Sequence, residues 1–360
     1  MRIVNKMKRV SIIGGGISGC FCAIRIKESH PDYEVSIFEH NDKLLKKIYA
    51  TGNGKCNFAN KGTLENKYND DFALEVIKGF NEQDIVNYFS AIGVPSKNVG
   101  DLIYPYSESA ETVANALLKR INELNIDVHL NDEVKNYDRG LLETVRATFK
   151  YDSLIISVGG QSSPNLGSNG SFYNSLIKHG YSFKECHPSL CPIKVRENTK
   201  MVEGIRSKVL VSLYQGNKLI HYEEGELLFK KDGLSGMVIF NMTHFINRLK
   251  ELKNITLHID FAKDMKGDYE SLVNPKLAKY LLNNKLDIHN TVFTFKDFYD
   301  YQNSQVTSGG ILLSELNKNL SSKKDKNIFF IGEVANIDAV CGGYNIMWAL
   351  ASAELVSKTI

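Results

Sequence analysis

Hydrophobic and polar positions in the first half of the chain form short apolar runs separated by amphipathic stretches. Apolar runs that predict buried strands lie at residues 10–13, 35–39, 128–130 and 154–160. Helical spacing of apolar residues follows residue 19 and returns over residues 82–92 and 111–124. Strands that alternate with helices predict a doubly wound α/β domain with a parallel sheet.

The pattern changes near residue 187. Short alternating or β-branched runs at residues 190–195, 208–230 and 255–261 predict an inserted β-barrel or small sheet, and "QGNK" marks a turn within it. Residues 271–286 and 295–304 are expected to form a short helical piece. "NIFFIGE", residues 327–333, predicts a strand that returns to the first sheet, and the last helix begins at residue 342.

These patterns predict a discontinuous first domain and two smaller parts inside it. The expected boundaries are residues 1–186 with 304–360 for the nucleotide-binding domain, 187–262 for the barrel-like domain and 263–303 for a small helical segment.

Composition and charge are those of an ordinary globular protein. The chain has 360 residues, a hydrophobic fraction of 43%, a charged fraction of 24% and a net charge of +3. The charge is spread without long blocks, which favours a solvated surface over a nucleic-acid footprint. The longest apolar runs are shorter than a membrane span requires, so none is expected.

Cysteine and histidine usage points to no metal or disulfide framework. The six cysteines show no C-x-x-C spacing, which favours reduced thiols and a cytoplasmic location. The His, Cys, Asp and Glu residues show no metal-ligand spacing, so no metal site is predicted.

The first nucleotide signal is "KRVSIIGGGISGCFCAIRIKE". Gly14, Gly16 and Gly19 fit the G-x-G-x-x-G pattern between a strand and a helix. The first glycine permits a tight turn, the second lets the backbone approach a pyrophosphate, and the third lets the helix pack on the strand. Glu39 ends the next strand, where an acidic residue accepts hydrogen bonds from a ribose 2′-hydroxyl. NAD and FAD both use this unit, which leaves the choice between them open.

A second glycine loop, "LLKKIYATGNGKCNFAN", follows at once. Lys46, Lys47 and Lys55 can neutralise phosphate there, and Gly52 and Gly54 permit close approach of the backbone. An NAD-only dehydrogenase has no need of this loop, so the loop favours FAD.

These two loops resemble those of the BaiN/RdsA-type (YhiN-like) bacterial flavoproteins, a family of NAD(P)/FAD-dependent oxidoreductases. The resemblance continues through "IGVPSKNVGDLIYPYSESAETVANAL", "LIISVGGQSSPNLGSNGSFY", "EGELLFKKDGLSG", "SQVTSGGILLSELN" and "IFFIGEVANIDAVCGGYNIMWALAS". The chain departs from the family pattern at Leu45, which replaces a glycine, and at Lys46 and Lys55, which replace arginines. Lysine keeps the charge but loses the forked recognition of phosphate.

The resemblance implies a Rossmann-like FAD-binding domain, discontinuous in the chain, with an inserted β-barrel-like domain and a small helical segment. FAD would be non-covalent, and NAD(P)H would be a transient co-substrate. The residues expected to bind the cofactor are Gly14, Gly15, Gly16, Ile17, Ser18, Gly19, Glu39, His40, Lys46, Lys47, Thr51, Gly52, Gly54, Asn57, Val134, Val158, Gly159, Gly332, Glu333, Gly343, Tyr344, Asn345 and Ile346.

Within this set, the helix start at "CGGYN" is expected to hold the isoalloxazine ring. Its backbone N–H groups and positive helix end would stabilise the negative charge of reduced flavin. Val134 is expected to meet adenine through its backbone.

No catalytic acid or base is assigned from the sequence. Tyr104 or Tyr106 could donate a proton, although core packing is the favoured interpretation. His187 is a candidate acid at a domain junction, and Cys341 is favoured as a passive residue because it lacks a spaced partner.

The leading functional interpretation is an FAD-dependent oxidoreductase that passes hydride through flavin N5. NAD(P)H is the expected donor, and the resemblance implies a small organic acceptor with an activated C=C bond. The alternatives are a flavin oxidase or dehydrogenase that uses oxygen or a quinone, and a non-enzymatic FAD protein that senses redox state or associates with RNA. No nucleic-acid partner is expected in the leading interpretation.

Overall fold

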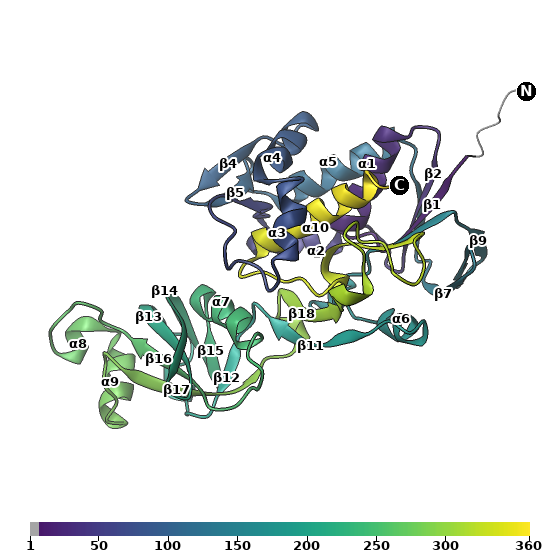
Figure 1. Cartoon of the computed structure of the whole chain (residues 1–360). Helices are drawn as coiled ribbons and strands as arrows, with labels where there is room; N and C mark the ends of the chain where they lie inside the picture. Colours follow the sequence, from purple (N-terminus) through teal and green to yellow (C-terminus); the bar gives the residue numbers. More distant parts are fainter. Residues whose placement is uncertain (1–6) are drawn as a thin grey trace, which may run out of the picture. The chain divides into compact units, whose positions relative to one another are not determined.

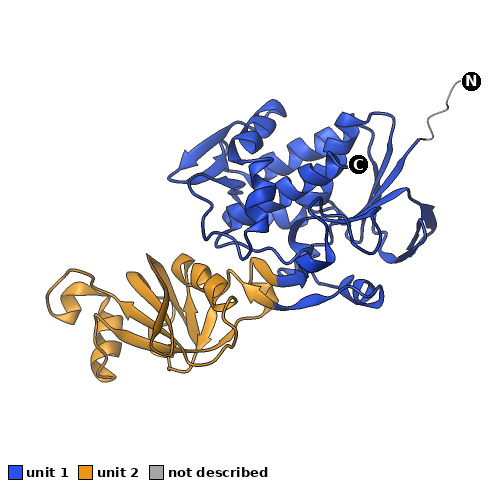
Figure 2. Cartoon of the chain, in the orientation of Figure 1, with its two compact units in different colours: residues 1–186, 309–360 blue, residues 187–308 orange. Residues whose placement is uncertain are grey.

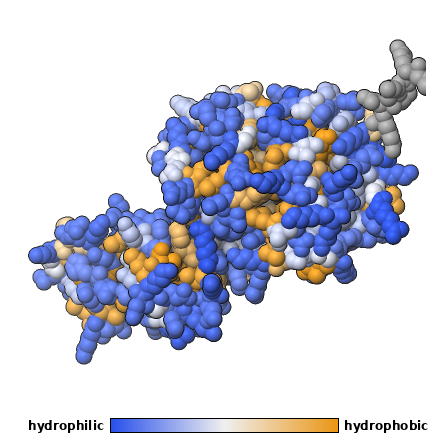
Figure 3. Space-filling model, viewed as in Figure 1, coloured by the Kyte–Doolittle hydropathy of each residue, from blue (hydrophilic) through white to orange (hydrophobic). Residues whose placement is uncertain are grey.

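The computed structural model describes residues 7–360, and it divides them into two compact units. The first unit runs up to Cys186 and resumes over Gly309–Ile360, and the second is His187–Ser308 (Figure 2). Each unit has its own cluster of buried apolar side chains. The hydrophobic residues that remain at the surface form small patches among hydrophilic ones in the view of Figure 3.

A parallel sheet lies at the centre of the first unit. Its strand order is β19-β10-β1-β2-β6, and all neighbouring pairs run parallel. The interior strand segments are almost continuously apolar because both faces of the sheet are covered. The strands are β1 (Arg9–Ile13), β2 (Glu34–Glu39), β6 (Asp127–Leu130), β10 (Ser153–Ile156) and β19 (Ile328–Phe330).

Three longer helices pack together in this unit. Helix α1 (Ile17–Ser29) contacts both α5 (Ala110–Glu123) and α10 (Gly342–Ser357), and α10 lies beside α1 although the two are at opposite ends of the chain (Figure 1). Arg25 of α1 donates to Glu354 of α10 at 2.7 Å. Helix α10 is buried along most of its length, which explains why apolar residues occur on all of its faces.

Shorter elements complete the first unit. Antiparallel strands β3 (Ala59–Asn60), β5 (Leu102–Pro105) and β4 (Ser96–Val99) form one small sheet, in that order. Strands β7 (Val134–Asp138), β8 (Leu141–Thr144) and β9 (Thr148–Lys150) form another. The remaining helical segments are α2 (Lys46–Ala50), η1 (Thr51–Gly54), α3 (Phe72–Lys78), α4 (Glu82–Ala91), η2 (Pro164–Leu166), α6 (Tyr173–Lys178), η5 (Leu313–Glu315) and η6 (Gly332–Val334).

The second unit is built on a closed barrel with the strand order β12-β15-β14-β13-β16-β17. Its strands are β12 (Ile193–Val195), β13 (Arg206–Gln215), β14 (Lys218–Lys230), β15 (Gly233–Ser235), β16 (Ile255–Asp260) and β17 (Thr291–Phe298). Helices and turns are α7 (Met237–Ile246), α8 (Tyr269–Leu272), α9 (Pro275–Asn283), η3 (Lys200–Val202) and η4 (Tyr301–Asn303). Strands β11 (Phe183–Ser189) and β18 (Val306–Ile311) pair where the chain passes between the units.

The prediction of an α/β Rossmann-like domain with an inserted barrel is confirmed. Helices α8 and α9 lie within the helical segment expected over residues 263–303, but β17 in the same range is a strand that closes the barrel between β16 and β12. Along β17, burial alternates over residues 291–295, which is the period of a strand. Helix α7 was not expected, since its β-branched and aromatic residues occur equally in strands.

No helix in residues 7–360 has the length and apolarity that a membrane crossing requires.

Candidate functional site

The glycine-rich turn after β1 shows a different environment for each glycine of the motif. A Cβ on Gly14 would lie 2.5 Å from the carbonyl oxygen of Ser157, and one on Gly19 would lie 2.1 Å from the carbonyl oxygen of Gly14. Gly14 also has a φ of +101°, which disfavours a side chain. A Cβ on Gly16, by contrast, would meet no protein atom within 4 Å. The first and third glycines therefore serve packing, and the second faces open space.

That space lies at the N-terminus of α1. Gly16 is the N-cap residue and supplies no side-chain cap, and the first turn holds no acidic residue. The first N–H groups of the helix thus have no side-chain acceptor from the cap, and the helix dipole is positive at this end. An anionic group such as a pyrophosphate fits these donors.

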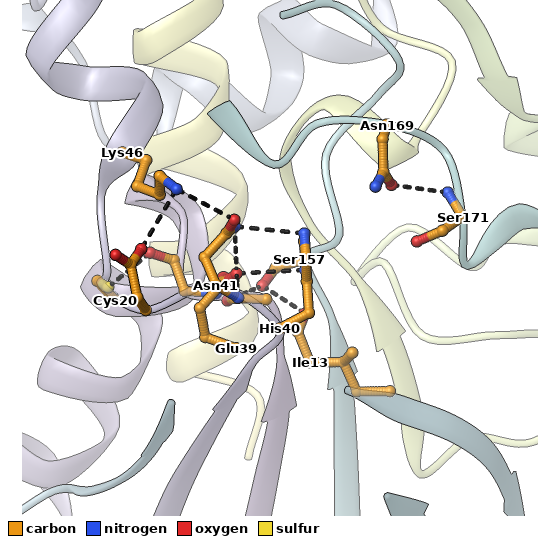
Figure 4. Close-up of polar contacts among 12 residues, drawn as sticks. Ile13, Cys20, Glu39, His40, Asn41, Lys46, Ser157, Asn169 and Ser171 are labelled. Atoms are coloured by element: carbon orange, nitrogen blue, oxygen red, sulfur yellow. Dashed lines mark hydrogen bonds and ion pairs between the residues drawn. The ribbon is translucent and has the colours of Figure 1, made fainter. Parts of the chain in front are cut away.

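Glu39 is fixed at the end of β2, beside the same turn. Its Oε2 accepts a hydrogen bond from the Gly15 N–H at 2.7 Å, and its Oε1 accepts from the Asn41 backbone and side-chain amides at 2.8 and 2.6 Å. The His40 ring lies 3.2 Å from the same Oε1. Figure 4 shows Glu39, His40 and Asn41 together with Lys46, whose Nζ is 3.3 Å from Asn41 Oδ1. Oε2, which accepts only the Gly15 N–H, keeps room for a further donor such as a ribose hydroxyl.

The lysines of the second loop are paired with acidic side chains. Lys47 Nζ lies 2.9 Å from Glu333 Oε2, which joins α2 to the end of β19. Lys46 Nζ lies 3.3 Å from Asp42 Oδ1. Two of the three positive charges predicted to meet phosphate are therefore partly neutralised by the protein itself.

Residues 51–56 form a tight turn of mostly left-handed backbone. Gly52, Asn53, Gly54 and Cys56 all have positive φ values, between 53° and 82°. The Thr51 hydroxyl donates to the carbonyl of Ile48 at 2.7 Å and so ends α2. Glycines are needed at two of these positions because a left-handed conformation is strained for most other residues.

The start of α10 packs closely against this region. A Cβ on Gly343 would lie 1.9 Å from Asn60 Oδ1 and 2.5 Å from Asn57 Nδ2. Asn57 Nδ2 donates to Asn60 Oδ1 at 3.0 Å, and Asn60 Nδ2 donates to Cys341 Sγ at 3.1 Å. The two asparagines therefore leave no room for a side chain at position 343, although the backbone of Gly343 is helical.

Cys341, the N-cap residue of α10, is held by these contacts. Burial raises the pKa of its thiol, and hydrogen bonds from the backbone of Tyr344 and from Asn60 act in the opposite direction. The net direction is upward, so the protonated thiol is favoured at neutral pH.

Two further glycine turns border the end of the parallel sheet. Gly332 has a φ of +71°, and a Cβ there would lie 2.7 Å from Ser18 Oγ of α1. Gly159 has a φ of +70°, and a Cβ there would lie 3.2 Å from Ser168 Oγ and 3.9 Å from Glu333 Oε2. Val158 is partly buried, and its Cα lies 3.2 Å from a Cβ built on Gly14. Several of the predicted residues therefore meet at the carboxyl end of the strands, where open α/β sheets bind ligands.

Other predicted residues have side chains that are engaged within the protein. The Asn345 amide bonds to backbone groups of Ala339 and Cys341. The Tyr344 hydroxyl donates to the carbonyl of Lys61 at 3.4 Å. Ser18, Val134 and Ile346 are buried, and Ile17 is partly buried, so backbone atoms are the main groups that they offer to a ligand. Their role in cofactor binding stays a prediction.

Two side chains at this site were absent from the predicted set. Asn60 links the second loop to Cys341, and the Tyr68 hydroxyl donates to the carbonyl of Tyr344 at 2.7 Å. One signal in the sequence points to Asn60, because "FAN" directly continues the "TGNGKCN" loop. Tyr68 lies in an irregular segment and carries no such signal. Among residues 7–360, His, Cys, Asp and Glu side chains form no group of three that could hold a metal.

A family model described as "HI0933-like protein Rossmann domain" matches residues 8–359. The chain belongs to this family. The match confirms the resemblance found in the sequence.

Two curated relatives cover nearly the whole chain. A 3-dehydro-bile acid delta(4,6)-reductase of Clostridium scindens is 26% identical over 98% of this chain and 98% of its own length. A ribosomal RNA dihydrouridine synthase of Haemophilus influenzae is 25% identical over 97% of each chain.

Solved structures show the same fold at lower identity. A flavocytochrome c3 fumarate reductase in its open conformation aligns with a TM-score of 0.51 at 14% identity, over 98% of this chain and 78% of that chain. Taken together, the family and its relatives support the coarser prediction, an FAD-dependent oxidoreductase family.

Proposed function

We propose that this chain binds FAD non-covalently and uses it to reduce a C=C bond conjugated with a carbonyl group in a small organic acceptor, with NAD(P)H as the electron donor. The observation that carries the proposal is the open space at Gly16, beside the N-terminus of α1 and the fixed carboxylate of Glu39. A glycine turn with room for a pyrophosphate, next to an acceptor for a ribose, is the chemistry of a dinucleotide site.

We assign each part of FAD to a different group of residues in the first unit. Gly14–Gly19 and the start of α1 would hold the pyrophosphate, and Glu39 would hold the adenosine ribose. The turns at Gly159 and Gly332, with Lys47 and Glu333, would border the middle of the cofactor. The start of α10 would hold the ring, which supplies hydride transfer when bound.

The class of acceptor is inferred from the curated relatives. One is named a delta(4,6)-reductase, and the other makes dihydrouridine. Both names describe reduction of a C=C bond in a conjugated system. The shared chemistry therefore supports a conjugated C=C acceptor for this chain, without fixing its identity.

RNA is the second candidate acceptor, because ribosomal RNA dihydrouridine synthases of Haemophilus influenzae and Escherichia coli are 25% and 24% identical to the chain. The spread of charge along the sequence favours the small molecule. The absence of a nucleic-acid partner stays a prediction until it is tested.

The test has three stages. Heat-denatured protein should release FAD, identified by chromatography. NADH or NADPH should bleach the flavin under anaerobic conditions. The reduced flavin should then be reoxidised by conjugated enones, or by a uridine-containing ribosomal RNA fragment for the second candidate. Release of FMN or NAD, or reoxidation by oxygen and quinones alone, would contradict the proposal.

A further inference from the structure

Tyr104 stands beside the part of the site where the ring of the cofactor is proposed to bind. It lies on β5, and β5 is held there by pairing with β3 and by the Ile103 N–H, which donates to Asn57 Oδ1 at 3.2 Å. A Cβ on Gly52 would lie 3.7 Å from Cε1 of the Tyr104 ring. The tyrosine ring therefore packs on the turn that the second loop forms.

The Tyr104 hydroxyl is free to bind a ligand. It makes no hydrogen bond to any of residues 7–360, and the side chain is partly exposed. The nearby Tyr68 and Tyr344 differ, because their hydroxyls donate to the carbonyls of Tyr344 and Lys61. A phenol has one donor and seeks an acceptor when it is partly removed from water.

Charged and titratable groups around Tyr104 favour a protonated phenol that can lose its proton. Burial raises the pKa of Tyr104, the charge of Lys55 lowers it, and Cys341 and Glu108 raise it. Lys55 Nζ lies 2.8 Å from Glu108 Oε2, and the Lys55 side chain is 54% exposed. At neutral pH Tyr104 carries its proton, and a nearby ammonium group stabilises the phenolate that forms when the proton leaves.

We propose that Tyr104 is the catalytic acid of the reduction. This inference rests on the function proposed above. In the step, the β-carbon of the conjugated C=C bond gains a hydride, the π bond breaks, and the electron pair moves to the α-carbon. That carbon takes the proton from Tyr104 Oη, and the phenolate recovers a proton from water beside Lys55. The acceptor gains two electrons and two hydrogens in total.

Two other groups near the site fit this role less well. Tyr106 is 68% exposed, and Lys97 lies 5.7 Å from its ring centroid, so it is a surface residue. Cys341 is the second alternative, but its sulfur is held within the protein by the hydrogen bond that it accepts from Asn60.

The first test separates the two half-reactions in Tyr104→Phe. The flavin is reduced photochemically, so that no nucleotide donor is needed, and is mixed with 2-cyclohexen-1-one, with a steroid 4,6-dien-3-one or with menadione. Loss of a general acid slows reaction by about 10²–10⁴-fold. We expect that loss for the enones and little change for menadione, whose oxygen atoms take protons directly from water. Tyr106→Phe is the matched control and should behave as the wild type.

The second test needs no turnover. In protein labelled with ¹³C at tyrosine Cζ, Tyr104→Phe assigns the Tyr104 signal in the apoprotein. Addition of FAD should shift that signal and leave the Tyr106 signal in place. Lys55→Met should raise the pKa of Tyr104, because it removes the positive charge.

The outcomes distinguish the inference from the function on which it rests. Equal enone rates in Tyr104→Phe and wild type, or a Tyr104 signal unmoved by FAD, would overturn the catalytic role alone. If no enone reoxidises the wild-type flavin, the proposed function fails, and the role of Tyr104 fails with it.

Discussion

At the scale of single residues, the glycines of the first turn have separable roles. Gly14 and Gly19 face backbone atoms, whereas Gly16 faces open space. A side chain at Gly14 should therefore disturb the fold, whereas one at Gly16 should compete with the ligand that we propose to bind there. This contrast gives a matched pair of variants.

We expect Gly16→Val to fold and to lose FAD. The N-cap φ of Gly16 is −73°, which valine tolerates, but its methyl groups would fill the space proposed for the pyrophosphate. The flavin content after purification and the thermal transition of the apoprotein measure the two effects. Gly14→Val should instead give little folded protein, since its Cβ would overlap the Ser157 carbonyl. Full flavin content in a folded Gly16→Val protein would show that the phosphate lies elsewhere.

Glu39→Ala should weaken FAD binding without abolishing it. One charge-assisted hydrogen bond to a ribose contributes about 1.5–3 kcal/mol, which is roughly a 10- to 150-fold change in Kd. The variant also leaves the Gly15 and Asn41 amides without their carboxylate, so the apoprotein should melt at a lower temperature. Titration of apoprotein with FAD, followed by fluorescence, gives the Kd. An unchanged Kd would exclude contact between Glu39 and the cofactor.

At the scale of elements, the start of α10 is fixed by the small sheet opposite it. Asn60 of β3 holds Cys341, and a side chain on Gly343 would collide with Asn60 and Asn57. The helix start, the second loop and β5 therefore form one packed group, in which the Ile103 N–H of β5 donates to Asn57.

Gly343→Val should slow reduction of the flavin and lower its midpoint potential. The backbone of Gly343 is helical and has no positive φ, so valine should not strain the backbone. The expected cause is instead a clash of the valine side chain that displaces the Asn57–Asn60 pair and the helix N-terminus. Loss of one aimed N–H donor costs about 2.7–4 kcal/mol in other enzymes. Potentiometry and anaerobic bleaching at matched FAD occupancy measure the change. A wild-type potential and rate would mean that this helix start serves only the fold.

The ion pair between α1 and α10 should control stability with a defined pH dependence. Burial raises the pKa of Glu354, but the hydrogen bonds and charges of Arg25 and Lys358 lower it by more. The pKa of Glu354 therefore lies below its usual value. The lowered pKa stabilises the folded protein at pH values above about 4.3, the pKa of a glutamate in the unfolded chain. This stabilisation is lost as the pH falls through the pKa of Glu354 in the folded protein.

Arg25→Met should therefore cost about 3 kcal/mol of unfolding free energy at pH 7, because it leaves a buried carboxylate with only Lys358. Near pH 4 the loss should shrink. Denaturant unfolding at both pH values tests this. Lys119→Met, which removes an exposed pair with Glu123, is the control and should cost less than about 0.5 kcal/mol. An equal loss at pH 4 and pH 7 would contradict the ionic explanation.

At the scale of the whole molecule, the barrel is an insertion into the nucleotide-binding unit. Each unit has a separate core, and the chain leaves and re-enters the first unit at neighbouring points. A Cβ on Gly309 would lie 2.9 Å from Cys186 Cα, so a short linker can replace the inserted unit.

The chain in which a short Gly/Ser linker replaces residues 187–308 should fold and bind FAD. All residues that we propose to hold the cofactor lie in the first unit. Circular dichroism and FAD titration measure the result, with Gly16→Val in the shortened chain as the control for specific binding. A folded shortened chain without affinity for FAD would show that the barrel contributes to the cofactor site.

Local patterns in the amino-acid sequence were enough to predict the parallel strands, the glycine turn, the place of Glu39 at the end of a strand and an inserted β-rich unit. These features depend on local periodicity and on backbone conformations that few residues adopt, and both can be read from neighbouring positions. The second loop was recognisable for the same reason, because its glycines lie within a few residues of each other.

The contacts between distant side chains, by contrast, depend on how the whole unit folds. Lys47 and Glu333 are 286 positions apart, and Asn60 and Cys341 are 281 positions apart, so no local pattern joins them. The same holds for β17, whose assignment as a barrel strand depends on its pairing with β12 and β16. Strand pairing and side-chain contact are set by the packing of the whole unit, which overrides local preference where the two differ.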